Sequence, residues 1–480
     1  MIYETVIGLE VHVELATETK LFCSCSSKFG AEPNENVCPA CAGMPGMPAV
    51  LNKRAVELGI AAALVTNSQI SPVMTFDKKN YYYPDLPAGY QITQWAAPIC
   101  TRGWVEVETS QGSKCITLKQ IHIEEDAGKL VHDPRTGSSL VDFNRTSVPL
   151  VEVVSNPDFR TSEEVIAYLE KLRLLLSFAG VSDCKMQEGS MRCDVNISIR
   201  EKGSDILGTR TEIKNMNSLR AIARAIAFEK ERHIDALETG CETLIQETRR
   251  WDDNKGESFA MREKENATDY RYFPNPELMP VVISDDMISA VRSALPESSQ
   301  SRFERMTGEY CLPEKESRQI TESLALAEVF DGTTALCGLP REVLSWMTVD
   351  LLAMAKSENK GADDIKIDCE KFANLIKMVE EKTINRQTGK KILQKVLDEN
   401  IDPVEYVKEE GLGIVANDGQ LEKVINQVLA DNPDSVRQYK DGNTKIVGFF
   451  VGKVMREMKG RADPAAINET LKKLLDLSVI

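Results

Sequence analysis

Gly8-Leu9-Glu10-Val11-His12-Val13-Glu14-Leu15 is a segment in which apolar and polar residues alternate without a break. Side chains of a β-strand point to opposite faces in turn. The pattern therefore predicts a strand with Glu10, His12 and Glu14 on one face and an apolar opposite face. Because burying an unpaired carboxylate costs free energy, such groups usually pair with a cation or a metal ion. The segment predicts a sheet with one covered apolar face and one polar face that carries ligands.

Two later segments repeat this mixture of apolar and acidic residues. They are Ile121-His122-Ile123-Glu124-Glu125-Asp126-Ala127-Gly128-Lys129 and Leu150-Val151-Glu152-Val153-Val154. If all three strands share one sheet, they form an oxygen-rich site suited to Mg²⁺ or Mn²⁺, which predicts an enzyme. In a regular strand His122 and Glu124 share a face and Glu125 points away, whereas a bulge would reverse this. The pattern leaves both glutamates open as ligands.

The rest of residues 1–294 predicts an α+β domain. Hairpins are expected at 105–121 and 130–143, and helices at 161–179 and from Ser218 to Thr239. Alternation in the strands at 193–200 and 209–214 places polar side chains on one face, among them Asp194, Arg210, Glu212 and Lys214. We therefore predict an antiparallel sheet with helices on its apolar face and an open polar face for a large charged substrate.

The second half of the chain predicts helices. Residues 295–402 carry apolar stripes at helical spacing, for example over 341–356 and 371–381, and indicate an all-α domain. From residue 403 to 480, short helices alternate with polar or glycine-rich turns, which indicates a separate helical tail.

Four cysteines form the most specific local motif. Cys23-Ser24-Cys25 is followed after twelve residues by Cys38-Pro39-Ala40-Cys41. Two short-spaced pairs with proline and glycine nearby indicate a knuckle, and four thiolates suit a closed, structural Zn²⁺ site. The alternatives are four free thiols in a loop, or a disulfide.

A loop at residues 77–87 joins basic and aromatic residues. It contains Lys78, Lys79 and three consecutive tyrosines beginning at Tyr81. Lysine holds phosphate and tyrosine stacks on a base, so the loop fits nucleotide binding. A surface loop between prolines, with tyrosines in the core, is an equal alternative. Tyr270-Arg271-Tyr272-Phe273-Pro274 gives a similar, weaker signal.

The net charge of −16 argues against general nucleic-acid binding, because such proteins tend to be basic. Residues 437–461 are a local exception, with seven basic residues against two acidic ones. This patch fits RNA phosphates, although a solvated helix face explains it equally well.

The chain also lacks several familiar signals. The N-terminus has no basic and apolar leader, and most of the twelve cysteines are scattered, so we expect a reducing cytoplasm. No run of 18 apolar residues predicts a membrane span, so we expect no membrane partner. Glycine-rich phosphate loops and a Gly-x-Ser-x-Gly elbow are absent from the sequence, so any nucleotide binds by another design.

Taken together, the motifs resemble one family. Residues 4–12, 76–81, 122–129 and 269–274 are similar to the B subunit of the glutamyl/aspartyl-tRNA amidotransferases, the GatB family. The resemblance covers the whole chain, and the tail at 403–480 looks like the YqeY-type tail of that family. It implies a catalytic domain like the glutamine synthetase fold over 1–294 and ATP-dependent amidation of misacylated Glu-tRNA(Gln) or Asp-tRNA(Asn). Ammonia would come from glutamine hydrolysed in a separate A subunit, an amidase, and a small C subunit would hold the heterotrimer together.

The resemblance also implies roles for residues. Glu10, His12, Glu125 and Glu152 would bind Mg²⁺, with Glu124 as the rival of Glu125, and Lys79 would hold phosphate. Substrate would meet Tyr81, Asp194, Arg210 and Lys214, and tRNA would meet Lys445, Lys453, Arg456 and Lys459. Cys23, Cys25, Cys38 and Cys41 match the branch with zinc; other members lack them, so the zinc would not serve the chemistry. The rival hypothesis is a tRNA-binding scaffold, which has no need for clustered metal ligands.

Overall fold

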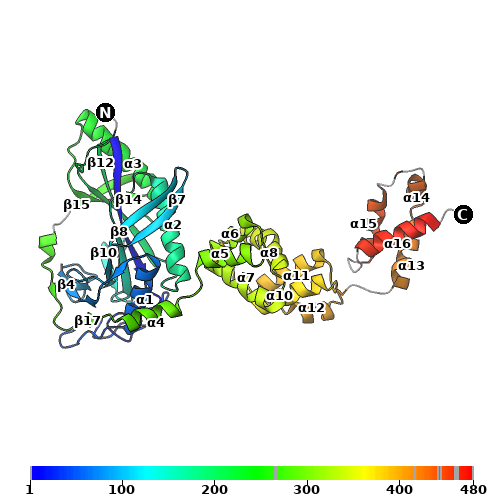
Figure 1. The fold of residues 1–480 in the computed structure, drawn as a ribbon, viewed down its shortest axis with the longest axis horizontal. Coiled ribbons are helices and arrows are strands. Elements are labelled where there is room, and N and C mark those ends of the chain that lie inside the picture. Colours follow the sequence, from blue (N-terminus) through cyan, green and yellow to red (C-terminus); the bar gives the residue numbers. More distant parts are fainter. Residues whose placement is uncertain are drawn as a thin grey trace. The chain divides into compact units, whose positions relative to one another are not determined.

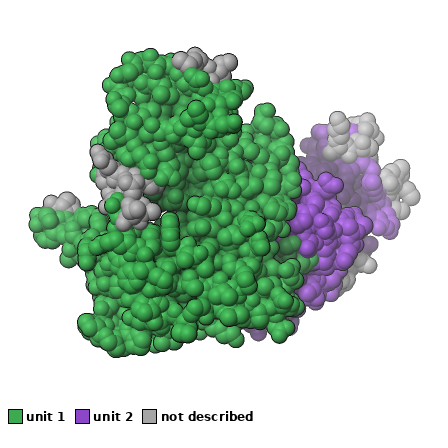
Figure 2. Space-filling view, turned by 60° about the vertical axis from the view of Figure 1, so that its left-hand side comes forward, with its two compact units in different colours: residues 1–298 green, residues 299–480 purple. Residues whose placement is uncertain are grey.

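The computed structural model describes residues 3–133, 135–263, 267–413, 418–440, 443, 446–458 and 464–477. The chain divides into two compact units, residues 1–298 and 299–480 (Figure 2). Unit 1 contains the large sheet, and the described part of unit 2 is helical (Figure 1).

The described residues of unit 1 form one ten-stranded sheet. In spatial order its strands are β15 (Glu257–Glu263), β14 (Glu247–Asp252), β13 (Thr211–Lys214), β12 (Met191–Glu201), β1 (Tyr3–Glu14), β11 (Pro149–Ser155), β8 (Gly112–Glu125), β6 (Cys100–Thr101) and β2 (Gln69–Ile70), with β7 (Trp104–Thr109) paired to β8. Neighbouring strands run antiparallel, except that β13 and β14 run parallel. The prediction of an antiparallel sheet therefore needs this one correction.

The alternation in the N-terminal segment does determine the two faces of the sheet. Leu9, Val11 and Val13 are at most 1% exposed and join the main hydrophobic core. The helices α1 (Lys53–Val65), α2 (Ser162–Phe178) and α3 (Leu219–Thr239) contribute to the same core and cover this face (Figure 1). The predicted division into a covered apolar face and a polar face is confirmed.

Both predicted hairpins and both predicted helices are present. Strand β7 pairs with β8, and β9 (Lys129–Asp133) pairs with β10 (Ser138–Asp142). Each helix begins after a hydroxyl residue that caps it: Thr161 accepts from the Glu164 N–H, and Ser218 from the Ala221 N–H.

Two helices of unit 1, α1 and α4 (Asp285–Ala294), are not predicted by the sequence pattern. Helix α1 is buried along most of its length, so it has no polar stripe to reveal the helical period.

Small sheets accompany the large one. β4 (Asp77–Asn80) pairs with β5 (Tyr90–Thr93) on one side and with β16 (Phe273–Pro274) on the other. This arrangement brings the lysine–tyrosine loop together with the segment at 270–274, which follows the turn η1 (Ala267–Tyr270). A two-stranded sheet joins β3 (Val73–Met74) to β17 (Val281–Val282).

Unit 2 has two hydrophobic clusters among its described residues, one within 306–412 and one within 421–475. Its helices are α5 (Ser299–Gly308), α6 (Glu314–Thr321), α7 (Leu324–Cys337), α8 (Pro340–Ser345), α9 (Leu352–Ser357), η3 (Ala362–Asp364), α10 (Cys369–Glu380), α11 (Arg386–Glu399), α12 (Pro403–Glu409), α13 (Asp418–Ala430), α14 (Pro433–Lys440), α15 (Val447–Glu457) and α16 (Pro464–Leu477). Val407 of α12 belongs to the first cluster, so this helix packs with residues before 402. The three-domain division of the sequence stays a prediction.

The helix expected over 341–356 is interrupted by a π-helical turn, η2 (Trp346–Leu351), between α8 and α9. Asp350 lies in this turn, is 3% exposed, and forms ion pairs of 2.7 Å with Arg386 and Lys390. Sequence periodicity does not reveal such a turn, because it adds one residue to an otherwise helical pattern.

A buried ionic network joins α3 to the strands β13, β14 and β15. Glu229 is fully buried and pairs with Arg232 at 2.8 Å and Arg249 at 3.3 Å. His233, also fully buried, is 2.9 Å from the hydroxyl of Thr211. Burial and the nearby Arg232 lower the pKa of His233 to about 4.

This network predicts a loss of stability in acid. His233 is neutral in the fold and binds a proton in the unfolded chain below a pH of about 6.5. The contribution of His233 to the free energy of unfolding is therefore present above that pH and is lost as the pH falls toward 4. For a pKa shift of this size the loss is about 3 kcal/mol. In urea unfolding between pH 7 and 4.5, the free energy of unfolding should depend less on pH for His233→Gln than for the wild type. The exposed His132, replaced in the same way, should leave the dependence unchanged; parallel wild-type and His233→Gln curves would contradict the assignment.

Among the described residues, no helix is both long and apolar enough to cross a membrane.

Candidate functional site

Two histidines and two glutamates meet on the polar face of the central strands. His12 on β1 lies opposite Glu152 on β11, and Glu152 lies opposite His122 on β8, so these three side chains form one row across the sheet. The His122 Nε2 is 2.7 Å from a Glu152 oxygen. The His12 Nε2 lies between the two carboxylates, 3.3 Å from Glu124 and 3.7 Å from Glu152.

The structure brings Glu124, and not Glu125, into this cluster. Strand β8 keeps a regular register with β11 from Gln120 to Glu125, and the irregularity comes farther along, between Val154 and Ser155. Glu125 therefore points to the other side, where one carboxylate oxygen accepts from the Ile92 N–H at 2.8 Å. The assignment of Glu125 to the set of Glu10, His12 and Glu152 is thus not supported by the geometry.

The histidines and glutamates of the cluster shift one another's pKa values toward the charged forms. Burial alone would lower the pKa of His12, but Glu152 and Glu124 outweigh it and raise this pKa to about 9. The same carboxylates raise the pKa of His122 to about 10 against its burial. Burial opposes ionisation of Glu124, yet its hydrogen bonds to His12 and His122 hold its pKa well below the usual range. The two imidazoles and the two carboxylates therefore stabilise one another's charged forms.

Three of these four side chains fit a divalent cation. Ligand atoms of His12, Glu124 and Glu152 lie within 4.8 Å of one another, close enough to share one ion. Carboxylates suit Mg²⁺ or Mn²⁺. Because a histidine ligand must be neutral, binding would release protons. His122 is the member that motif matching missed, although its spacing of two from Glu124 placed both on one face.

A second carboxylate group lies beside the first on the same face. Glu10 on β1 is opposite Asp194 on β12, and ligand atoms of Glu10, Asp194 and Glu212 fall within 4.8 Å of one another. Lys214 forms ion pairs with Asp194 and, at 3.2 Å, with Glu212. Asn196 donates to Glu10 at 3.0 Å. Lys214 thus supplies positive charge to a group that could also hold a cation.

Arg210 does not belong to this group. It is exposed and precedes the first residue of β13, so the alternation that places Glu212 and Lys214 on one face does not extend to it. The expected position of Arg210 among the polar residues of this strand is wrong, because the strand is shorter than the sequence pattern indicates.

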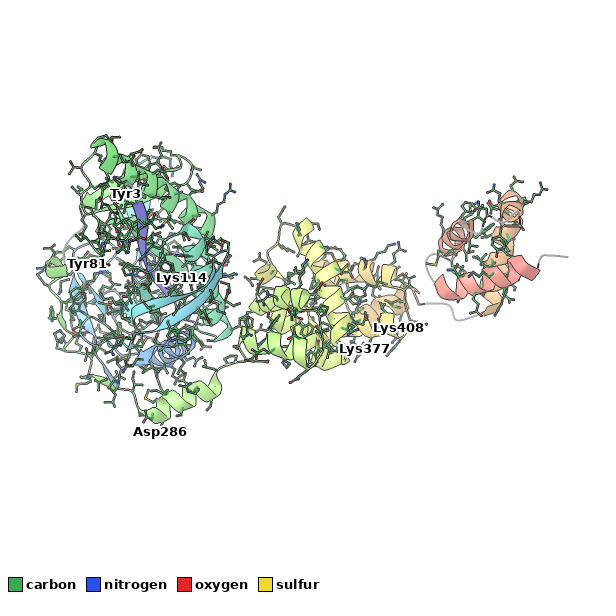
Figure 3. The ribbon with its side chains drawn as sticks, turned by 45° about the horizontal axis from the view of Figure 1, so that its top comes forward. Tyr3, Tyr81, Lys114, Asp286, Lys377 and Lys408 are labelled. Carbon is green, nitrogen blue, oxygen red and sulfur yellow. The ribbon has the colours of Figure 1, made fainter. Side chains whose placement is uncertain are left out.

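The sheet of β4, β5 and β16 covers part of the cluster. The Thr93 hydroxyl of β5 donates to Glu124 at 2.9 Å. On β4, the ammonium of Lys79 lies 4.8 Å from the ring centre of Tyr270 and 5.5 Å from that of Tyr81. Tyr81, labelled in Figure 3, directly follows β4. Trp95, about half exposed, stacks on Tyr272 at 4.5 Å between ring centres. A lysine with flat aromatic rings thus stands beside the carboxylates.

The four cysteines of the predicted knuckle converge. Their sulfur atoms lie within 4.8 Å of one another, and all twelve cysteines of the chain are free thiols. The Cys38 N–H donates to the Cys41 sulfur at 3.2 Å, as expected of a knuckle. A hydrogen bond from the Cys23 thiol lowers the pKa of Cys41 to about 4. Gly43 has φ +67°, and a Cβ there would come within 2.7 Å of the Ala88 backbone, so the turn requires glycine. This donor set fits tetrahedral Zn²⁺.

The tail residues are described only in part. Lys445 and Lys459 lie outside the described residues. The Lys453 ammonium donates to the Asn432 side chain at 2.7 Å and lies 5.0 Å from the ring centre of Phe449. Arg456, on the same helix α15, is exposed.

The chain is similar to known proteins over nearly its whole length. A family model described as the GatB/GatE catalytic domain matches residues 5–289, and one described as the GatB domain matches residues 328–475. Three curated relatives are named as the B subunit of aspartyl/glutamyl-tRNA(Asn/Gln) amidotransferase. The protein of Lachnoclostridium phytofermentans is 51% identical over 99% of both chains. Those of Agathobacter rectalis and Caldicellulosiruptor bescii are 50% and 47% identical, over 98% and 99% of this chain and 99% and 100% of their own.

Proposed function

Because the chain belongs to the GatB family of tRNA amidotransferase B subunits, we propose that its polar sheet face phosphorylates the side-chain carboxylate of an aminoacyl-tRNA and replaces the phosphate with ammonia. The family resemblance of the motifs is thereby confirmed. The observation that supports the chemistry is the cluster of His12, His122, Glu124 and Glu152.

The reaction needs an activated carboxylate, because a carboxylate itself is a poor electrophile. Transfer of the γ-phosphoryl group of ATP to one side-chain oxygen forms an acyl phosphate and releases ADP. Ammonia then adds to the carbonyl carbon, the bond from that carbon to the phosphate oxygen breaks, and one ammonia proton passes to the departing phosphate, which yields the amide and inorganic phosphate. A Mg²⁺ ion held by His12, Glu124 and Glu152 would neutralise charge on the transferring phosphoryl group.

The surrounding residues bind the two substrates. Lys79 supplies a cation for phosphate next to the rings of Tyr81 and Tyr270, and the stacked pair of Trp95 and Tyr272 offers a flat surface to a base. Glu10, Asp194 and Lys214 form the other border of the site and orient the aminoacyl end or the ammonia.

The assembly follows from the same premise. GatB relatives are named as subunits, so this chain works within a larger amidotransferase. We propose an amidase, the A subunit, that hydrolyses glutamine, together with a small C subunit and misacylated tRNA(Gln) or tRNA(Asn) as substrate. We also propose a glutamine synthetase-like arrangement for unit 1, supported by clustered carboxylates on one face of a mainly antiparallel sheet, and one Zn²⁺ in the knuckle.

The alternative, a tRNA-binding scaffold, makes a different prediction for the assembled complex. With Glu-tRNA(Gln), glutamine and ATP, a kinase subunit forms one ADP for each amide, and the yield of ADP depends on the charged tRNA. A His12→Ala variant should lose both products while binding tRNA as the wild type does. Wild-type ADP formation by this variant would favour the scaffold.

We predict that removing the helical tail weakens tRNA binding and leaves glutamine hydrolysis unchanged. Removing residues 414–480 keeps α12, whose Val407 packs in the first cluster of unit 2, and removes the basic patch. We expect tRNA affinity to fall by about tenfold or more, because several phosphate contacts are lost together. Filter binding at two salt concentrations measures this, with glutamine hydrolysis as the control for an intact complex. Unchanged affinity after the truncation would show that tRNA binds elsewhere.

A further inference from the structure

Lys20 is a lysine with no exposed surface, which is rare for this residue. It lies three residues before the first cysteine of the knuckle. Taking an ammonium group out of water is costly unless each of its three N–H groups finds an acceptor and an anion lies close by.

All three donors of Lys20 have an acceptor. The ammonium donates to the Asn36 carbonyl at 2.7 Å, to the Phe143 carbonyl at 3.1 Å and to the Cys41 sulfur at 3.6 Å. Three acceptors match a charged ammonium, because a neutral amine would leave one of them without a proton. In the described part of the chain no carboxylate pairs with Lys20, so the Cys41 sulfur is its anionic partner.

Lys20 contacts both halves of the knuckle. Its backbone N–H donates to the Cys25 carbonyl at 2.9 Å, next to the first pair of cysteines. Its ammonium reaches Cys41 in the second pair and Asn36 between the pairs, while Phe143 follows strand β10 in the body of unit 1. One residue therefore joins both halves of the knuckle to unit 1.

The charge of the site explains why a cation is needed there. Four thiolates around one Zn²⁺ carry a net charge of −2 in a partly buried place, where Cys41 is the buried ligand. A buried ammonium on one sulfur reduces this to −1, and its hydrogen bond holds that sulfur in position, as partners of metal ligands do.

We propose that Lys20 is a positioning residue of the four-cysteine site, whose ammonium binds the Cys41 thiolate, offsets the excess negative charge and slows release of the metal. This inference rests on the proposed zinc. It goes further by assigning a function to a side chain outside the four ligands.

The test compares zinc binding by the full-length wild type and Lys20→Met, which shortens the side chain by one atom and removes its charge. Metal analysis of the wild type should give about one zinc per chain. In competition with a chromogenic chelator, Lys20→Met should bind zinc about 10- to 100-fold more weakly. With Co²⁺ in place of zinc, the thiolate-to-metal absorption band should shift in the variant, because one sulfur loses its hydrogen bond.

The control is Lys53→Met, the same replacement at a side chain that is 85% exposed on α1, and it should behave as the wild type. A merely structural Lys20 would lower the melting temperature equally with and without zinc and leave chelator competition unchanged; that result overturns the proposal. Should Lys20→Met fail to fold, Lys20→Gln, which retains an N–H donor, makes the same comparison. A wild type without zinc would instead refute the zinc site itself, so the two failures are distinguishable.

Discussion

Replacing Glu124 with glutamine is expected to lower amide formation on charged tRNA by about 100-fold or more, while tRNA binding and glutamine hydrolysis continue. The Glu124 carboxylate is 3% exposed and lies 3.3 Å from His12 and 3.5 Å from His122, with Thr93 donating to it. Glutamine has nearly the same shape but no charge, so the cluster keeps its packing and loses one anionic ligand. Loss of one preorganised electrostatic group commonly lowers turnover by a factor of about 10²–10³.

The matched control is Glu108→Gln, the same change at an exposed position of β7 in the same sheet. It should retain wild-type activity. Melting curves separate a loss of chemistry from a loss of folding. Amide formation within a few-fold of the wild type by a folded Glu124→Gln complex would exclude this carboxylate from the reaction.

Replacing both Cys38 and Cys41 with serine is expected to remove the zinc entirely, from about one ion per chain to none. Structural zinc contributes about 10–16 kcal/mol of apparent binding free energy in small zinc peptides, so its loss should open the knuckle. The knuckle loop also has other attachments, since Asn36 N–H bonds to Asn144 and Asn34 N–H to Asp142. We therefore expect faster proteolysis near residues 23–47 and a lower melting temperature, with unit 1 still folded.

Cys115→Ser serves as the control, because Cys115 is exposed on β8 and lies outside the four-cysteine group. Metal analysis and limited proteolysis of both proteins make the comparison. A double variant that keeps its zinc would show that the metal, where present, is bound by other residues.

Strand alternation predicted the polar face of the sheet correctly, because burial of one face requires it. The segment around His12 is regular over its whole length, so Glu10 and His12 lie where the pattern places them. The same argument favoured Glu124 over Glu125 for a regular strand, and β8 is regular at this point. Motif matching had favoured Glu125, and adjacent acids in a sequence cannot be separated without the direction of their side chains.

Other parts of the site could not be derived from the sequence. Which strands are neighbours depends on packing between distant segments, and this order places His122, Glu152 and His12 in one row. The stack of Trp95 on Tyr272 joins residues far apart in the chain, and neither position has a local pattern that indicates a pair. Lys20 likewise has no signal in the sequence, because only its burial reveals that its charge needs a partner.

We propose that the side-chain carboxylate of the aminoacyl-tRNA is phosphorylated at the cluster of His12, His122, Glu124 and Glu152. The direct measurement uses tRNA(Gln) charged with glutamate whose side-chain carboxylate oxygens are both ¹⁸O. The assembled complex converts it with ATP and glutamine, and mass spectrometry analyses the inorganic phosphate. If the carboxylate oxygen attacks the γ-phosphorus, each amide formed leaves one ¹⁸O in phosphate, and Glu124→Gln lowers both products together by about 100-fold or more. Amide formation by the wild type with no ¹⁸O in phosphate would contradict phosphorylation of the side-chain carboxylate.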